Sequence, residues 1–88
     1  MKLFGALRDR AGTGMVEAPG GMTIRGILEY LGKTYGPPVR DLLLEEKDGR
    51  QEKRQPVVLL IEGRPQIDLE REVGRDETVT IFPAVAGG

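Results

Sequence analysis

The chain ends in the stretch Val79-Thr80-Ile81-Phe82-Pro83-Ala84-Val85-Ala86-Gly87-Gly88. Its first four residues favour a β-strand, and the strand is expected to stop at Pro83 because proline has no N–H for a further ladder bond. The following residues are small and finish with two glycines, so they can lie extended in a slot too narrow for a Cβ atom. We therefore predict a final strand and then a flexible tail over residues 84–88.

The terminal carboxylate of Gly88 is the candidate functional group. A carboxylate is a poor electrophile, but its acyl adenylate can be attacked by a sulfur donor or an amine. Glycines at a chain end more often indicate disorder than chemistry. A strand that stops at a proline and is followed by a terminal Gly-Gly is a more specific pattern, and it favours a reactive terminus.

Composition excludes several classes of function. With 88 residues the chain forms one domain, and its 13 basic and 14 acidic residues give a net charge of −1. Neither nucleic acid nor an anionic membrane is favoured by that balance. The absence of cysteine and histidine removes the thiolate nucleophile, the commonest general base and the usual metal ligands, so no metal site is predicted. The longest apolar run, residues 57–61, is too short to span a membrane, and we expect a cytoplasmic protein.

The sequence of residues 2–18 predicts an N-terminal hairpin. Residues 2–8 are assigned to a first strand, with Leu3, Gly5 and Leu7 on one face and Phe4 on the other. Residues 15–18 follow as a second, short strand.

A helix is predicted after Thr23, whose hydroxyl can cap the first turn. Its apolar positions follow the helical spacing and form one face. They are Ile24, Ile27, Leu28, Leu31 and Tyr35. Gly36 and the prolines that follow it end the helix.

The middle of the chain has no single clear period. Residues 39–44 fit either a short helix or a strand, and residues 45–55 a solvated hairpin or loop around Asp48-Gly49. Residues 57–61 predict a central strand buried on both sides. After a turn, residues 66–67 form a short strand, and Leu69 and Val73 enter the core.

The two phenylalanines of the chain are predicted to lie on the same face of the sheet. Val79 and Ile81 lie on one face of the last strand, which leaves Phe82 on the other, and Phe4 is likewise opposite Leu3. Both rings then lie on the sheet face away from the helix, where an apolar patch indicates a partner surface. A shift of one residue in the assigned register would bury both instead.

Three stretches carry a resemblance to a known family. They are Ile81-Phe82-Pro83-Ala84-Val85-Ala86-Gly87-Gly88, Gly74-Arg75-Asp76-Glu77-Thr78-Val79 and Leu3-Phe4-Gly5-Ala6-Leu7-Arg8. These stretches resemble the ubiquitin-like sulfur carriers, most closely the small subunit of molybdopterin synthase and more distantly the thiamine-pathway carriers. The resemblance implies an α+β, β-grasp (ubiquitin-like) domain over residues 1–83, with a mixed sheet of four to five strands and one main helix packed across it.

The resemblance also implies a mechanism in which the chain is a carrier and its partners are the enzymes. A ubiquitin-activating-like adenylyltransferase would use ATP and Mg²⁺ to adenylate Gly88, and a persulfide donor would convert it to a thiocarboxylate. The large subunit of molybdopterin synthase, or another sulfur-acceptor enzyme, would then receive the sulfur. The chain itself would bind no cofactor. Its partner-binding residues would be Phe4, Phe82, Pro83, Ala84, Val85, Ala86 and Gly87.

Two departures leave the sulfur acceptor open. The tail continues as Pro83-Ala84 where many molybdopterin synthase small subunits have two prolines, and the insert over residues 45–55 is longer. Both departures resemble carriers that serve cysteine synthesis or tungsten-cofactor pathways. Thiamine and tRNA thiolation pathways are further alternatives. A ubiquitin-like protein modifier conjugated through Gly88, and an interaction module with an inert tail, are rivals from other classes.

Overall fold

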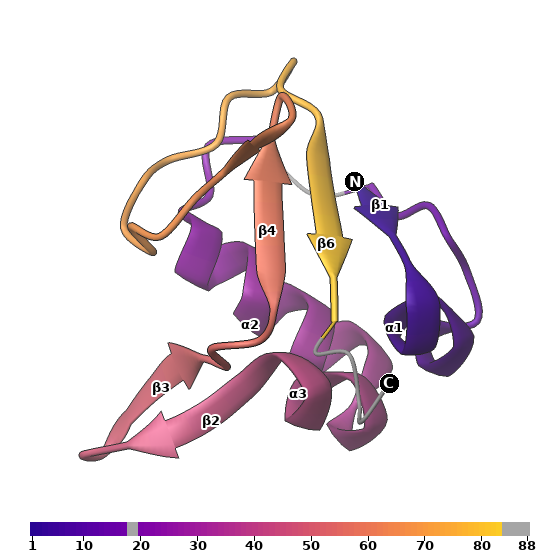
Figure 1. The fold of residues 1–88 in the computed structure, drawn as a ribbon, viewed down its shortest axis with the longest axis vertical. Coiled ribbons are helices and arrows are strands. Elements are labelled where there is room, and N and C mark those ends of the chain that lie inside the picture. The colour runs from indigo at the N-terminus through magenta and orange to yellow at the C-terminus, as the bar shows by residue number, and fades with distance from the viewer. Residues whose placement is uncertain (18–19, 84–88) are drawn as a thin grey trace.

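The computed structural model describes residues 1–17 and 20–83. These residues form three helices and six strands (Figure 1). In chain order they are β1 (Lys2–Leu3), α1 (Gly5–Ala11), α2 (Ile24–Tyr35), α3 (Pro37–Leu43), β2 (Leu44–Lys47), β3 (Arg50–Lys53), β4 (Val58–Ile61), β5 (Arg64–Pro65) and β6 (Val79–Phe82).

The main sheet has the strand order β1-β6-β4-β5. The last strand lies between the first strand and β4, parallel to β1 and antiparallel to β4 (Figure 1). Strand β6 thus has neighbours on both edges, although it is made from the end of the chain. The predicted α+β layer with a mixed sheet is confirmed.

Helix α2 is the main helix and begins and ends as its sequence predicts. The Gly26 N–H donates to Thr23 Oγ1 at 3.0 Å, which satisfies one of the free amides of the first turn. Gly36 ends the helix with a φ of 80°, a conformation that glycine adopts without strain. The next helix, α3, then starts directly with Pro37, so the ambiguous residues 39–44 are mostly helical.

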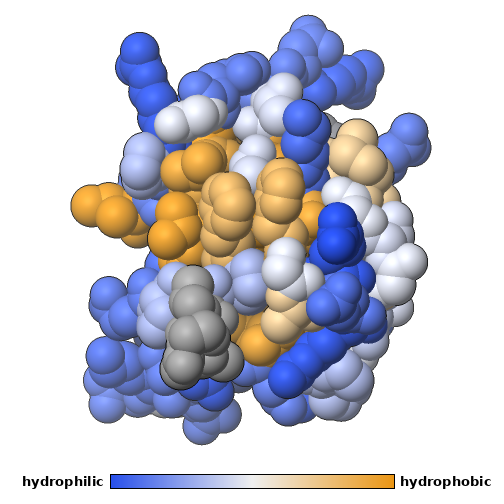
Figure 2. Space-filling model, turned by 45° about the vertical axis from the view of Figure 1, so that its right-hand side comes forward, coloured by the Kyte–Doolittle hydropathy of each residue, from blue (hydrophilic) through white to orange (hydrophobic). Residues whose placement is uncertain are grey.

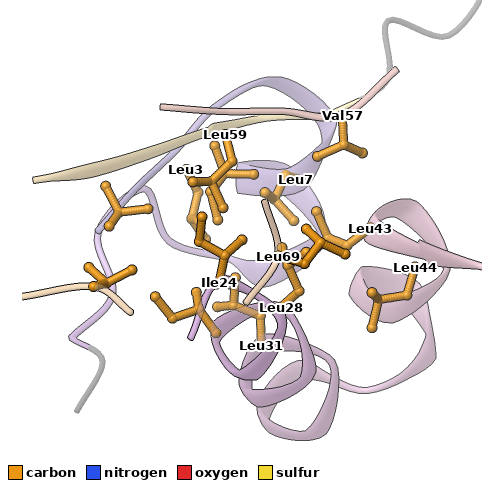
Figure 3. Packing of buried hydrophobic residues seen from close by; sticks show 14 of the residues in the cluster. Leu3, Leu7, Ile24, Leu28, Leu31, Leu43, Leu44, Val57, Leu59 and Leu69 are labelled. Carbon is orange, nitrogen blue, oxygen red and sulfur yellow. The ribbon is translucent and has the colours of Figure 1, made fainter. Parts of the chain in front are cut away.

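The core lies between the inward face of the sheet and the helices. It contains residues from every helix and from the strands β1, β2, β4 and β6. Figure 3 shows most of them. Its members are Leu3, Leu7, Ile24, Ile27, Leu28, Leu31, Val39, Leu43, Leu44, Val57, Leu59, Ile61, Leu69, Val73, Val79 and Ile81. The predicted core positions Leu69 and Val73 are confirmed.

The charged insert is a hairpin, one of the two predicted forms. Strands β2 and β3 pair antiparallel around Asp48 and Gly49, which both have positive φ values of 53° and 77°. Such a two-residue turn matches the twist of the flanking strands. The hairpin projects away from the main sheet (Figure 1).

The strand predicted over residues 2–8 is wrong beyond Leu3. Gly5 has a φ of 60°, which turns the chain out of the sheet and into α1. Leu3 and Leu7 are both buried, as predicted, but Leu7 reaches the core from a helix. A spacing of four residues brings side chains to one side in a helix and also in a strand, so these leucines could not separate the two.

Three smaller predictions also need correction. The second strand over residues 15–18 is reduced to an isolated bridge between Met15 and Lys2, and Ala18 lies outside the described residues. The returning strand is Arg64–Pro65, and Ile67 beyond it is 92% exposed. Residues 57–61 are not buried on both sides, because the helices pack against one face of the sheet and leave Val58 exposed on the other.

None of the helices in the described ranges is long and apolar enough to cross a membrane.

Candidate functional site

The candidate site begins with the two faces of β6. Val79 and Ile81 point inward and are buried, while Thr80 and Phe82 point to the opposite side. Residues paired across neighbouring strands share a face. Phe82 is paired with Val58, and Thr80 with Leu60. We call the surface formed by Phe4, Val58, Leu60, Thr80 and Phe82 the outer face.

The two phenylalanines lie together on the outer face. Their rings are stacked, with centroids 4.8 Å apart and planes inclined by 17°. Each side chain is 38% exposed, so the contact covers only part of each ring. The prediction that Phe4 and Phe82 both lie on the face away from the helix is confirmed.

The stack brings together the beginning and the end of the described chain. Leu3 of β1 is the partner of Ile81, and the Phe4 N–H donates to the Ile81 carbonyl at 3.2 Å. Pro83 follows Phe82 and is buried. The predicted partner-binding residues Phe4, Phe82 and Pro83 are therefore neighbours.

The remaining predicted site residues lie outside the described residues. They are Ala84, Val85, Ala86, Gly87 and Gly88. Their predicted roles stay predictions.

The outer face is more apolar than the sequence indicated. Val58, 42% exposed, lies opposite Phe82, and half-buried Leu60 continues the surface along β4. Figure 2 shows an apolar patch in the middle of one face of the molecule, with hydrophilic residues around it. The unbroken apolar run of residues 57–61 predicted burial on both sides of the sheet. Only the pairing of β4 with β6 in the structure assigns Val58 and Leu60 to the surface.

A separate set of polar contacts fixes the loop between β5 and β6. The guanidinium of Arg71 donates to both carboxylate oxygens of Glu77, at 3.1 and 2.9 Å, and the Gly74 N–H donates to Glu77 at 2.8 Å. These bonds, chiefly those from Arg71, lower the pKa of Glu77 to about 2. The pair lies in the loop that carries core residue Val73, so we assign it a structural role.

The other end of this loop caps helix α2. The N–H groups of Ile24 and Arg25 donate to the carbonyls of Arg71 and Leu69, which satisfies amides that lack partners within the helix. Arg25 also pairs with Glu70, with an N to O distance of 2.7 Å, and this bond is the main cause of its raised pKa. The loop is thus held at both ends.

The outer face has no catalytic group of its own. Its side chains are aromatic or aliphatic, with one threonine hydroxyl. Within the described residues there is no group of three or more side chains of the metal-ligating kinds close enough to hold a metal ion. Such a surface suits the binding of another protein, while any chemistry must take place elsewhere.

Comparisons with known proteins agree on the fold. The family model of the ThiS family matches residues 1–88. The solved structure of small archaeal modifier protein 1 from Methanosarcina acetivorans is similar, with 27% identity, a TM-score of 0.82, and coverage of 99% of this chain and 92% of that chain. Small archaeal modifier protein 1 from Haloferax volcanii has 26% identity and a TM-score of 0.73, with 99% and 94% covered.

A further solved structure is alike in fold alone. The Haloferax volcanii protein HVO 2177 has 24% identity and a TM-score of 0.75, with coverage of 99% of this chain and 82% of that chain. The comparison with curated proteins gives no match. Together, the solved structures confirm the predicted β-grasp, ubiquitin-like fold.

Proposed function

Because the chain belongs to the ThiS family, we propose that it is a sulfur carrier whose Gly88 carboxylate is the reacting group. The observation that supports this most is the path of β6. This strand is held by hydrogen-bonded neighbours on both edges and leads directly through Pro83 into residues 84–88. An exposed apolar surface lies beside that exit, where a partner enzyme can bind the folded domain while it acts on the terminus.

The first proposed step is adenylation by a ubiquitin-activating-like partner that binds ATP and Mg²⁺. A carboxylate oxygen of Gly88 attacks the α-phosphate of ATP, and pyrophosphate leaves. A persulfide then attacks the acyl carbonyl and AMP leaves, and a thiol reduces the resulting acyl disulfide to release the thiocarboxylate. The partners supply the acids, bases and metal ion, because the chain contains no cysteine or histidine.

The acceptor that we favour is a pterin precursor of the molybdenum or tungsten cofactor, held by the large subunit of a molybdopterin synthase. The resemblance of residues 81–88 to the small subunit of that enzyme supports this choice. Acceptors in cysteine, thiamine or tRNA thiolation pathways use the same carrier chemistry. We propose that the chain acts in the cytoplasm and binds neither nucleic acid nor membrane.

A second candidate is a protein modifier that is conjugated to lysines through Gly88. It is favoured by the similarity to two solved structures, which are small archaeal modifier proteins. In this reaction an amine attacks the acyl adenylate in place of the sulfur donor. The product is an isopeptide bond.

Pyrophosphate exchange tests the proposed activation. The wild-type chain, incubated with its cognate activating enzyme, Mg²⁺, ATP and labelled pyrophosphate, should support exchange of label into ATP. A chain lacking Gly88 should not, while its thermal unfolding midpoint stays close to that of the wild type, because terminal residues generally add few contacts. Equal exchange by both chains would contradict the assignment of Gly88.

Mass spectrometry of host proteins separates the two candidates. Arg75 is the last basic residue of the chain, so trypsin would leave residues 76–88 attached to each modified lysine. Finding this remnant supports the modifier. Its absence, together with a thiocarboxylate on the isolated chain, supports the sulfur carrier.

A further inference from the structure

Strands β1 and β6 stop pairing at the same position. Their last paired residues are Leu3 and Ile81. Continuing this register by two residues places Phe4 beside Phe82 and Gly5 beside Pro83. The rings of Phe4 and Phe82 are stacked, and the Pro83 ring lies at contact distance from the place that a Cβ atom at position 5 would occupy.

The ladder ends there for a reason on each strand. Pro83 has no N–H and cannot donate a further ladder bond. On the other strand, the φ of 60° at Gly5 turns the chain into α1. The last residue before the tail must therefore be held by packing.

Gly5 provides the surface on which Pro83 packs. A Cβ atom at position 5 would lie 3.4 Å from Pro83 Cγ and 3.6 Å from Cδ. That is ordinary contact distance, so a methyl group would just fit and a larger side chain would meet the proline ring. Pro83 is buried although it is the last described residue.

We propose that Phe4 and Gly5 are positioning residues that form a seat for Phe82 and Pro83, and that this seat fixes where the tail leaves the fold. The inference rests on the proposed function, since it assigns these residues a role toward the Gly88 carboxylate. Stacking holds the Phe82 ring, and only a residue with no more than a methyl group at position 5 leaves the Pro83 ring undisturbed. We assign neither residue a chemical step in the reaction.

The seat affects the reaction because five residues separate Pro83 from the end of the chain. A small displacement of Pro83 shifts the point at which the tail starts, and so changes where the Gly88 carboxylate lies relative to the ATP bound by the partner. Misplacement of a reacting group by about 1 Å can cost up to about 100-fold in rate. A change at Gly5, which is not part of the outer face, should therefore lower kcat and leave docking through the outer face intact.

Matched substitutions at Gly5 and Gly12 test the seat. Both glycines have positive φ values, 60° and 78°, but a Cβ atom at position 12 would have no neighbour within 4 Å. Asparagine tolerates this backbone conformation better than most residues, so Gly5→Asn and Gly12→Asn make similar backbone demands. Only Gly5→Asn adds atoms beside Pro83. Gly5→Ala adds only a methyl group, which fits beside Pro83, so it reports the effect of backbone strain at this φ without the added bulk.

The first readout is adenylate formation by the activating enzyme. Gly5→Asn should lower kcat by about tenfold or more with a KM within about twofold of wild type. Gly12→Asn and Gly5→Ala should retain kcat within about twofold, and unfolding midpoints identify any general loss of stability. Equal kcat values for Gly5→Asn and Gly12→Asn would overturn the seat.

The second readout does not depend on the enzyme. Because the chain has no cysteine, a spin label can be attached at one introduced thiol, Asp9→Cys, on the exposed side of α1. Relaxation of the Gly87 and Gly88 amide protons by this label should change in Gly5→Asn and stay the same in Gly12→Asn. An unchanged pattern in Gly5→Asn would contradict the seat. Failure of the wild-type chain to be adenylated would instead contradict the proposed function, and the relaxation experiment would still decide on the seat.

Discussion

Each face of β6 carries a large apolar side chain, Ile81 on one and Phe82 on the other, but the two faces differ in burial. Val79 and Ile81 are almost completely buried against the helices, whereas Phe82 on the other face remains 38% exposed, beside exposed Val58. Folding explains the inward residues, because they close the core. It does not require an aromatic stack on the outer face, and an apolar surface that folding leaves exposed is typical of a binding site for another protein.

The largest effect on stability is expected from the inward face. Ile81 has 0% exposure, so Ile81→Ala should lower the free energy of unfolding by about 2–5 kcal/mol, as large-to-small changes in cores do. Urea unfolding measures the loss. A loss under about 1 kcal/mol would mean that the core does not depend on β6 as described.

Phe82→Ala should separate docking from stability. We expect a loss of about 1 kcal/mol in unfolding free energy, because the ring is partly exposed and its main aromatic contact is the Phe4 stack. Affinity for the activating enzyme should fall at least about tenfold, as for an aromatic residue near the centre of an interface.

Calorimetric titration of the enzyme with folded Phe82→Ala provides that measurement. Tyr30→Ala is the matched control, because Tyr30 is also a partly exposed aromatic residue but lies on α2, on the inward side of the sheet. If the two variants bind equally well, the outer face is not the docking surface.

A charge on the outer face should affect binding alone. Val58→Lys places an ammonium group opposite Phe82, on a side chain that is already 42% exposed. Its unfolding free energy should stay within about 0.5 kcal/mol of wild type. Binding to the activating enzyme should weaken, because an unpaired charge would have to be desolvated at the interface. Thr34→Lys adds the same charge on the exposed side of α2 and should bind normally.

The smallest expected effect is on stability at acidic pH, and it arises in the loop between β5 and β6. The Arg71 guanidinium and the Gly74 N–H lower the pKa of Glu77 from 4.5 to about 2. The Arg71–Glu77 pair therefore contributes its full stabilisation of the fold at pH values above 4.5, the ordinary pKa of the carboxyl group. This stabilisation is lost as the pH falls from about 4.5 through about 2 and Glu77 becomes protonated. Glu77→Gln should therefore show a smaller fall in unfolding free energy over this range than wild type.

Urea unfolding at several pH values checks this difference. Glu72→Gln is a suitable control, because Glu72 is an exposed carboxylate of the same loop. A wild-type profile that coincides with Glu77→Gln would exclude a contribution from the Arg71–Glu77 pair.

Local signals in the sequence predicted much of this fold. The end of β6 before Pro83, the capping hydroxyl of Thr23 and the turn at Asp48-Gly49 each depend on the chemistry of one or two residues. The buried face of α2 follows from its helical spacing. The resemblance to ubiquitin-like sulfur carriers then supplied the arrangement of these elements.

Features that depend on pairing between distant segments could not be predicted. The residues of α1 also fit a strand, and the switch at Gly5 depends on a φ value that the sequence does not reveal. Val58 and Leu60 belong to a continuous apolar run, and only their pairing with Phe82 and Thr80 places them on the outer face. The seat under Pro83 likewise requires the parallel pairing of β1 with β6.

The intact mass of the chain after reaction with the activating enzyme, Mg²⁺, ATP and sulfide tests the central claim most directly. We predict that the wild-type mass rises by the difference between one sulfur atom and one oxygen atom, and that a C-terminal fragment carries the increase. The chain lacking Gly88 should keep its original mass. An unchanged wild-type mass with an enzyme that activates its own carrier, or the same increase without Gly88, would contradict a reactive carboxylate at the end of this chain.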